Sequence, residues 1–278
     1  MTSAFCPGHI SCVFQPRRVD NLLRSGSRGL GISISLGATA EVEEADSLIC
    51  TVNGSGTDAT VTAEALRIMG AEGLRADIMT DLPLSQGFAM SAAGTVAACL
   101  AYASLTGLSE DCAFQAAHRA ELLCGGGMGD VAGIMSGGVS MRLEEGLPPY
   151  GSASRLDLDG EILLAVLGPP LITAGVLNDR EMCESIEAAG GRALEAFIPR
   201  PGWGTLFQVA REFASQTGLV GEEVAECIRR LEPYGEASMC MLGNSIFFRG
   251  DIEKALSVID PSRSWVCKVD IEGPRLLG

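Results

Sequence analysis

Two spacings of hydrophobic residues alternate along the chain and separate predicted strands from predicted helices. Alternating or continuous apolar runs bounded by turn residues are typical of strands, and apolar residues three and four positions apart are typical of amphipathic helices. Strands are predicted over residues 4–14, 32–42, 47–52, 74–82, 139–143, 161–167, 245–248 and 264–269. Helices are predicted over residues 61–69, 91–105, 110–123, 205–216, 222–231 and 252–258, and a helix broken by glycines over 171–197.

Turn residues mark the segments between these elements. Asn53, Gly54, Ser55 and Gly56 form a strong turn signal after the third strand. The glycines of segment 26–31 predict a loop before the second strand. The helix predicted after Ser109 gains a capping side chain from this serine and favourable negative charge in its first turn.

A looser composition over residues 144–159, rich in glycine, proline and serine, predicts a domain boundary. The predicted domains are therefore residues 1–155 and 156–278. Strands separated by pairs of helices predict an α+β fold with antiparallel sheets in both halves.

The composition is that of a globular protein with a sizeable core, because 47% of the 278 residues are hydrophobic and 20% are charged. The formal net charge of −15 argues against a nucleic-acid surface, which needs clustered lysine and arginine. An anionic substrate must then be attracted locally, by helix N-termini, a metal ion or a few placed arginines.

The ten cysteines are scattered without a CxxC pair, and several occupy apolar patterns in which a free thiol packs as a small hydrophobe. Only two histidines are available, so a Cys/His zinc site has little support. The first residues lack the basic-then-apolar pattern of a signal peptide, which predicts a cytoplasmic protein with reduced thiols.

The stretch between Asp81 and Glu110 carries no charge and is long enough to span a membrane. It contains Pro83, Ser85 and Gly87, however, and the remainder is mostly alanine. A loop followed by a buried helix explains this composition better than a membrane span.

The loop and helix start over residues 83–94 have the character of an anion site. Small residues let backbone N–H groups approach a phosphate closely, and the helix N-terminus adds partial positive charge. The hydroxyl of Ser91 can also ligate a metal ion that bridges phosphates. The chain has neither a GxxxxGK[ST] loop nor a GxGxxG after a strand. The alternative is a small-residue helix start selected for tight packing.

Two acids, Glu121 and Asp130, flank a glycine-rich segment after a predicted helix. One suits a magnesium ion and the other a proton-accepting role at a hydroxyl, and His118 shares the helical face of Glu121. The alternative is an exposed glutamate and a turn aspartate, but the glycines cost backbone entropy with no packing benefit that the sequence reveals. Arg142, in a strand pattern, is either a solvated edge residue or a bidentate clamp on a carboxylate.

Together these segments resemble the motifs of the GHMP kinase superfamily, which includes galactokinase, homoserine kinase and mevalonate kinase. The first motif resembles Cys6-Pro7-Gly8-His9-Ile10, the second resembles residues 83–94, and the third resembles residues 237–243. This chain has Ala89 and Met90 where the second motif usually has glycine and serine, and its third motif lacks the usual glycine pair.

Within that superfamily the sequence is most similar to the archaeal pantoate kinase family, over residues 27–31, 118–131 and 137–142. The resemblance implies an N-terminal α/β domain and a C-terminal ferredoxin-like domain, with ATP and substrate in the cleft between them. It implies ATP-dependent phosphorylation of the primary hydroxyl of pantoate to 4-phosphopantoate, a step of archaeal coenzyme A biosynthesis, with Mg²⁺ as cofactor.

The resemblance also implies roles for individual residues. Ser91 and Glu121 would hold magnesium, and Asp130 would act at the substrate hydroxyl, as a base or by orienting it. The residues implied in binding pantoate are Ser27, Arg28, His118 and Arg142. The residues implied in binding the nucleotide phosphates are Pro83, Ser85, Gly87, Ala89, Met90, Ser91, Ala92 and Ala93.

Two alternatives remain at this point. One is a kinase of the same fold for another small alcohol, such as homoserine or mevalonate. The other is a non-catalytic regulatory protein of this fold, although the retention of Ser91, Glu121 and Asp130 together argues against it. The expected partners are small molecules, with no nucleic acid and no membrane, and a homodimer is the general expectation for a soluble protein.

Overall fold

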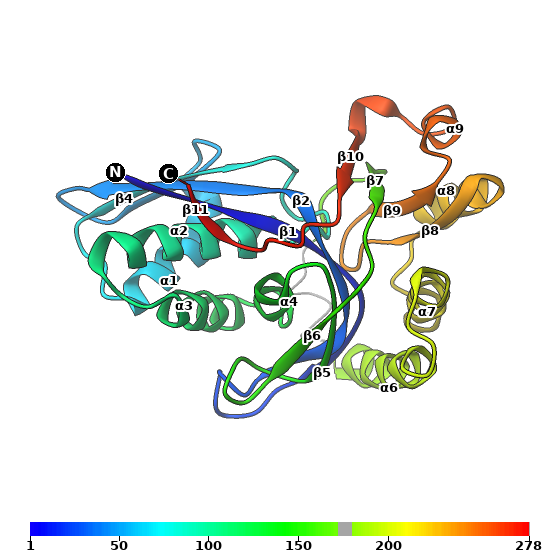
Figure 1. Ribbon diagram of the computed structural model, residues 1–278, viewed down its shortest axis with the longest axis horizontal. Helices are drawn as coiled ribbons and strands as arrows, with labels where there is room; N and C mark the ends of the chain where they lie inside the picture. The colour runs from blue at the N-terminus through cyan, green and yellow to red at the C-terminus, as the bar shows by residue number, and fades with distance from the viewer. Residues whose placement is uncertain (172–179, 278) are drawn as a thin grey trace.

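Two long antiparallel strands, β1 (Thr2–Arg17) and β2 (Gly26–Glu44), run side by side through the computed structural model and curve along their length (Figure 1). The structure describes residues 1–171 and 180–277. The register between the two strands shifts after Pro7 and after Ser11. Such bulges increase the local twist and bend of a strand. The bend allows β1 to contact elements of both halves of the molecule.

The first sheet has seven strands and is built around β1 and β2. Its path runs β11-β1-β2-β4-β3, and β5 pairs with both β2 and β6. The additional strands are β3 (Ile49–Val52), β4 (Leu74–Thr80), β5 (Val139–Glu144), β6 (Ser152–Leu156) and β11 (Arg275–Leu277). All pairings are antiparallel except that of β3 with β4. The expected all-antiparallel sheet is therefore wrong at this one pair, because a helix crosses over between its two strands.

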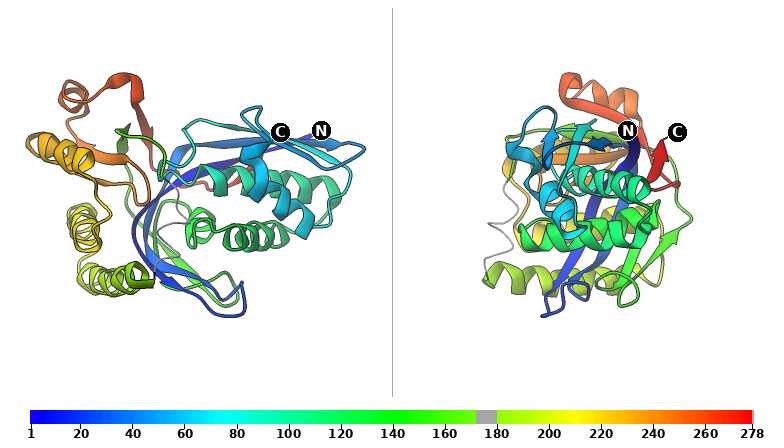
Figure 2. Two further views of the ribbon diagram at one scale, coloured as in Figure 1. Left: turned by 180° about the vertical axis from the view of Figure 1, so that it is seen from behind. Right: turned by 90° about the vertical axis from the view of Figure 1, so that its left-hand side faces the viewer.

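Four helices lie on one face of the first sheet (Figures 1 and 2). They are α1 (Thr60–Ile68), preceded by a 3₁₀ turn (Thr57–Ala59), α2 (Met90–Thr106), α3 (Glu110–Leu123) and α4 (Asp130–Ser136), with α3 packed on α1 and α2. The predicted alanine-rich helix is confirmed as α2, which is buried along most of its length and ends at Gly107. Ser109 caps α3, as predicted, by accepting a hydrogen bond from the N–H of Cys112. Within the described residues, none of the helices has the length and apolar character needed to cross a membrane.

The second sheet is antiparallel, with the strand order β10-β7-β9-β8. Its strands are β7 (Glu161–Val166), β8 (Gly235–Met239), β9 (Ser245–Gly250) and β10 (Ser264–Lys268). Helices α6 (Arg180–Phe197), α7 (Trp203–Thr217), α8 (Glu222–Leu231) and α9 (Ile252–Leu256) connect them, with 3₁₀ turns at Glu232–Tyr234 and Pro261–Arg263. This order, with helices between the strands, is ferredoxin-like and confirms the predicted α+β fold class. Residues 172–179 of the predicted broken helix lie outside the described residues.

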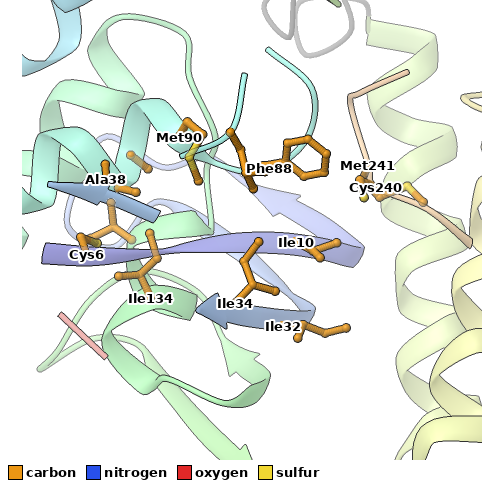
Figure 3. Packing of buried hydrophobic residues seen from close by; sticks show 14 of the residues in the cluster. Cys6, Ile10, Ile32, Ile34, Ala38, Phe88, Met90, Ile134, Cys240 and Met241 are labelled. Atoms are coloured by element: carbon orange, nitrogen blue, oxygen red, sulfur yellow. The ribbon is translucent and has the colours of Figure 1, made fainter. Parts of the chain in front are cut away.

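The two halves share contacts through the long strands. Helix α6 packs on β1, and α7 packs on both β1 and β8. The last strand, β11, returns to the first sheet and pairs with the beginning of β1. In Figure 3, Phe88 and Met90 lie over β1, and Cys240 and Met241 approach from the second half. The core is therefore continuous around the start of α2.

The predicted loop over residues 26–31 is wrong, because these residues form the first part of β2. Their glycines permit close packing. A Cβ at Gly29 would overlap the carbonyl oxygen of Val13, and a Cβ at Gly31 would overlap the imidazole of His9. Strands β6 and β11 were not predicted, because both are short and partly exposed and neither shows a clear apolar alternation.

Candidate active site

A pocket of about 840 Å³, partly open to solvent, lies where the two halves meet at the start of α2. Five segments supply its walls: strand β1, the start of β2, the loop into α2, the glycine loop after α3, and the loop after β8. The lining residues are Ser11, Phe14, Ser27, Ser85, Gly87, Ala89, Met90, Ser91, Ala92, Glu121, Gly126, Gly127, Met128, Gly129, Asp130, Met241 and Leu242.

The loop before α2 has left-handed backbone at alternate positions. Ser85, Gly87 and Ala89 have φ of 57°, 77° and 54°, and Ala89 is the N-cap of α2. Alternation of this kind turns successive backbone N–H groups toward one side and makes an anion-binding concavity. The first N–H groups of α2 add to it, because they have no partner within the helix and no side chain caps them. The loop can therefore bind phosphate through its backbone.

The phosphate residues expected from the sequence do not all face this pocket. Six of the eight line it, whereas Pro83 is exposed outside it and Ala93 is fully buried with its N–H bonded to the carbonyl of Ala89. Met90 contributes backbone, because its side chain packs on β1, where a Cβ at Gly8 would lie 2.5 Å from the Met90 methyl group.

Gln86 holds the same loop against the second half of the molecule. Its side-chain amide donates to the backbone carbonyl of Gly168 at 3.0 Å, and the backbone carbonyl of Gln86 accepts from the hydroxyl of Ser245 at 2.5 Å. A Cβ at Gly243 would overlap the backbone of Gln86. This contact could not be predicted from the sequence, because its partners come from distant parts of the chain.

Glu121 lies near the C-terminal end of α3 and is 2% exposed. Its Oε1 accepts a hydrogen bond from the hydroxyl of Ser91 at 2.9 Å, and its Oε2 accepts one from the N–H of Gly127 at 3.0 Å. Burial, reinforced by the nearby charge of Asp130, raises the pKa of Glu121 to about 7, although these two hydrogen bonds oppose the rise. The carboxyl group is thus held close to the midpoint of its titration at neutral pH.

Asp130 is the first residue of α4, where a negative charge is favourable. Its Oδ1 lies 3.0 Å from Nδ1 of His9 and 3.3 Å from the hydroxyl of Ser11. Burial alone would raise the pKa of Asp130, but the hydrogen bond from His9, the charge of Arg142 and the Ser11 hydroxyl together hold it below its usual range. Asp130 is therefore an ionised carboxylate at neutral pH.

The glycines between the two acids leave room for their carboxyl groups. A Cβ at Gly126 would overlap Oε2 of Glu121, and a Cβ at Gly127 would overlap Oδ2 of Asp130. Gly129 faces Ser27, and a Cβ at Gly129 would overlap the hydroxyl of Ser27. The glycine run is thus explained by close approach of three polar side chains to the backbone.

The four residues expected to bind pantoate are placed differently from one another. Ser27 lines the pocket, whereas Arg28, its neighbour on β2, points to the opposite face, because side chains alternate along a strand. His118 is buried on α3, where its Nε2 donates to the carbonyl of Ser25 at 2.9 Å, so it supports the segment that carries Ser27. The structure brings neither Arg28 nor His118 to the pocket wall.

Arg142 lies directly behind the pocket and is 1% exposed. Its Nη1 is 3.1 Å from the hydroxyl of Ser140 and 3.4 Å from Nε2 of His9, and its Nε is 3.4 Å from the carbonyl of Ser27. Among the described residues its Nη2 finds no hydrogen-bond partner. A Cβ at Gly129 would lie 3.2 Å from this atom, so the unpaired group lies just beneath the pocket lining.

No role was predicted for His9 or Ser11, which both contact Asp130 in the structure. The sequence contains the signal that could have found them: His9 belongs to the first motif that resembles the GHMP kinases, and Ser11 follows at the spacing that places both side chains on one face of a strand. Their contacts with Asp130 place both residues at the site, and Ser11 also lines the pocket.

This chain is similar to GHMP kinases and to pantoate kinases. The family model described as the GHMP kinases N terminal domain matches residues 55–138. The pantoate kinase of Thermococcus kodakarensis is 32% identical over 259 residues, covering 88% of this chain and 86% of that one. The pantoate kinase of Methanospirillum hungatei is 32% identical over 263 residues, covering 89% and 87%.

Solved structures extend the comparison to the fold. A protein described as a phosphotransferase related to the CoA biosynthesis pathway is 29% identical, covers 99% of this chain and 98% of its own, and has a TM-score of 0.89. The homoserine kinase from Cytophaga hutchinsonii has a TM-score of 0.64 at 16% identity, covering 99% and 97%. The second likeness concerns the fold alone.

Proposed function

This chain belongs to the pantoate kinase family, and we propose that it transfers the γ-phosphoryl group of ATP to the primary hydroxyl of pantoate. The products are ADP and 4-phosphopantoate, and the step belongs to coenzyme A biosynthesis. One observation carries the assignment of the site: the Ser91–Glu121 pair and the carboxylate of Asp130 line the same pocket at the N-terminus of α2. A phosphate-binding helix start and a hydroxyl-binding carboxylate are the two parts that such a transfer requires.

The nucleotide phosphates bind at the start of α2. The backbone of Gly87 and Ala89, with their left-handed conformations, and the free N–H groups of the helix supply hydrogen bonds without any lysine or arginine. Such a site suits this strongly acidic chain, because the attraction is local and does not depend on the net charge.

Ser91 and Glu121 fit a magnesium ion. Two neighbouring oxygens in an octahedral Mg²⁺ site at about 2.0–2.1 Å lie about 2.9 Å apart, and the Ser91 hydroxyl lies 2.9 Å from Oε1 of Glu121. No cluster of three or more His, Cys, Asp or Glu side chains suited to a metal ion occurs among the described residues. One carboxylate and one hydroxyl agree with the usual magnesium site of a kinase, where phosphates and waters complete the coordination. When bound, the ion would neutralise charge on the transferred group.

Asp130 orients the acceptor hydroxyl. Its Oδ1 is occupied by His9 and Ser11, whereas Oδ2 lies beside Gly127 at the pocket wall and accepts no hydrogen bond from the described residues. The ionised carboxylate accepts the hydrogen bond of the hydroxyl through Oδ2 and directs its oxygen toward the phosphorus. The transition state of phosphoryl transfer is loose, so positioning contributes more than proton abstraction.

Pantoate also carries a carboxylate, which needs a cationic or hydroxyl partner in this acidic protein. The unpaired Nη2 of Arg142 and the hydroxyl of Ser27 both lie against Gly129. A buried guanidinium with an unused N–H is costly unless a ligand satisfies it. This arrangement supports Arg142 and Ser27 as the carboxylate-binding pair, with His118 behind them as support for the strand.

The proposal is tested by ADP release with ATP and Mg²⁺, comparing pantoate, mevalonate, homoserine and pantothenate as acceptors. Turnover that depends on pantoate is expected. Turnover with a different alcohol would keep the kinase and overturn the substrate. No ADP release with any of the four acceptors, measured on protein shown to be folded, would favour the non-catalytic alternative.

The catalytic assignment is tested by Asp130→Asn. We expect kcat to fall about 100-fold or more while the affinity for ATP is retained. Asp46→Asn, at an exposed position far from the pocket lining, removes the same charge as a control. An equal loss of ATP affinity and turnover in Asp130→Asn would show that Asp130 belongs to the nucleotide site.

A further inference from the structure

His9 is fully buried, and two glycines from other elements make room for its ring. A Cβ at Gly31 on β2, or at Gly133 on α4, would overlap the His9 imidazole. The backbone N–H of His9 also donates to the carbonyl of Phe88, in the phosphate loop, at 3.1 Å. One residue of β1 is thus fixed against the second strand, the helix that begins with Asp130 and the loop that leads into α2.

The two ring nitrogens of His9 have different partners, which determine its tautomer. Nε2 lies 3.4 Å from Nη1 of Arg142, and a guanidinium can only donate. Nε2 must therefore be the acceptor, so the proton lies on Nδ1, which donates to Oδ1 of Asp130 at 3.0 Å. A doubly protonated ring would set one N–H against another. Burial lowers the pKa of His9, against the opposing effect of Asp130, which agrees with a neutral ring.

We propose that His9, held by Arg142 as the neutral Nδ1–H tautomer, is a positioning residue that orients the carboxylate of Asp130 for phosphoryl transfer. This inference rests on the proposed kinase function. With Oδ1 engaged by His9 and Ser11, rotation of the carboxylate is restricted and Oδ2 remains directed at the pocket beside Gly127. The bond from His9 to Phe88 ties the hydroxyl-binding side of the site to the phosphate-binding side.

Arg142 has two roles in this arrangement. Its Nη1 is used to fix the ring of His9, and its Nη2 remains available toward Gly129. The same guanidinium therefore connects the proposed carboxylate-binding position to Asp130 through one imidazole. Correct placement of the acceptor at both ends depends on this chain of contacts, in which His9 and Arg142 are buried and Asp130 is partly exposed toward the pocket.

The tautomer is measured directly by ¹⁵N NMR of the histidine rings in the full-length protein. The chain contains only two histidines, so the spectrum is simple, and the signal that disappears in His9→Gln belongs to His9. We expect His9 as the Nδ1–H tautomer and His118, whose Nε2 faces the carbonyl of Ser25, as the Nε2–H tautomer. A doubly protonated His9 at pH 7, or His9 as the Nε2–H tautomer, would overturn the inference. This measurement requires no substrate, so its outcome is independent of the proposed function.

The consequence for catalysis is tested with two variants that separate the hydrogen bonds. In His9→Asn the side-chain amide takes the place of Nδ1 and can still donate to Asp130. In His9→Gln the amide reaches the place of Nε2 and can satisfy Arg142 but not Asp130. We expect His9→Gln to lower kcat about 100-fold, as for a misplaced catalytic group, and His9→Asn to lose about 10-fold or less, with the KM for ATP unchanged in both.

The kinetic comparison uses whichever acceptor the wild-type protein phosphorylates, and circular dichroism confirms that each variant is folded. Equal losses in the two variants, or a change in the KM for ATP alone, would contradict the positioning role. If a variant does not fold, the wild-type tautomer and the kcat of Ser11→Ala decide the question, since Ser11 holds the same oxygen of Asp130. The wrong tautomer would by itself overturn the inference, and wild-type kcat in Ser11→Ala would show that holding Oδ1 of Asp130 does not affect turnover.

Discussion

The hydroxyl of Ser91 donates a hydrogen bond to Oε1 of Glu121 across 2.9 Å, and this contact joins the first turn of α2 to the C-terminal end of α3. Glu121 is almost completely buried, and its other oxygen is bonded to the N–H of Gly127. Two neutral hydrogen bonds do not replace the hydration that an ionised carboxylate loses on burial. Ionisation of Glu121 in the folded protein therefore costs free energy when no cation is bound.

This cost predicts how stability depends on pH. The pKa of Glu121 is raised from 4.5 in the unfolded chain to about 7 in the folded one. Below pH 4.5 both states are protonated and Glu121 has no effect. Between pH 4.5 and 7 the unfolded state releases its proton first, so stability falls as the pH rises. Above pH 7 the full cost is present, on the order of 3 kcal/mol at 1.36 kcal/mol per pKa unit.

Glu121→Gln remains neutral at every pH and is therefore expected to be more stable than the wild type at pH 8, with a smaller difference at pH 5. Urea unfolding in metal-free buffer at the two pH values measures the difference. Glu72→Gln, at an exposed position, controls for the simple loss of a carboxylate. A difference in stability that is equal at both pH values would show that Glu121 is ionised normally in the folded protein.

Gly127→Ala should impair catalysis without unfolding the protein. The new Cβ would overlap Oδ2 of Asp130, which must then turn away from the pocket. We expect kcat to fall about 100-fold, as for other displacements of a catalytic group by about 1 Å, with little change in the affinity for ATP. Gly204→Ala, whose Cβ would have no neighbour within 4 Å, is the control and should keep wild-type kcat. Wild-type turnover in Gly127→Ala would remove Oδ2 from the mechanism.

Ala89→Gly should stabilise the protein. Ala89 has a φ of 54°, and an L-residue pays about 1–2 kcal/mol for left-handed backbone, whereas glycine does not. Part of the gain is lost to the greater entropy of glycine in the unfolded chain, so we expect a net gain of about 1 kcal/mol and a rise in Tm of about 2–4 °C. Ala188→Gly, on the exposed face of α6, should shift Tm in the opposite direction. A lower Tm for Ala89→Gly would mean that the loop carries no such strain.

Ser27→Ala should weaken binding of the acceptor specifically. The loss of one hydrogen bond to a ligand corresponds to about 0.5–1.5 kcal/mol, so we expect the KM for pantoate to rise about 2- to 10-fold and the KM for ATP to stay the same. Steady-state kinetics with each substrate varied in turn measures both. Arg28→Ala tests the strand alternation: because Arg28 lies on the other face of β2, the KM for pantoate should not change. A larger effect in Arg28→Ala than in Ser27→Ala would reverse the assignment.

Much of the local structure is determined by the sequence alone. The predicted helix over 222–231 is confirmed as α8, and the predicted helix over 91–105 is confirmed as α2 within a residue at each end. Both results follow from local chemistry: α8 contains neither glycine nor proline, and Gly107 ends α2 in left-handed backbone with a φ of 73°. Ser91, Glu121 and Asp130 were candidates from the sequence, because each lies at a predicted helix end or glycine loop where small residues and acids recur together, and all three line one pocket.

The tertiary structure decided what depends on residues far apart in the chain. The glycines of 26–31 predicted a loop, because a glycine that permits a tight turn and one that permits close packing are the same letter in the sequence. The approach of Val13 to Gly29 and of His9 to Gly31 shows that the second reason applies. The parallel pairing of β3 with β4 and the return of β11 to the first sheet are likewise set by non-local pairing.

The same division holds in the site. The sequence supplied the acid of Asp130 but not its partner, since His9 is 121 residues away and touches it only after β1 and α4 pack together. Propensity and spacing act over a few residues. The orientation of a carboxylate, the tautomer of an imidazole and the pKa of a buried acid depend on which distant groups surround them and on how completely water is excluded.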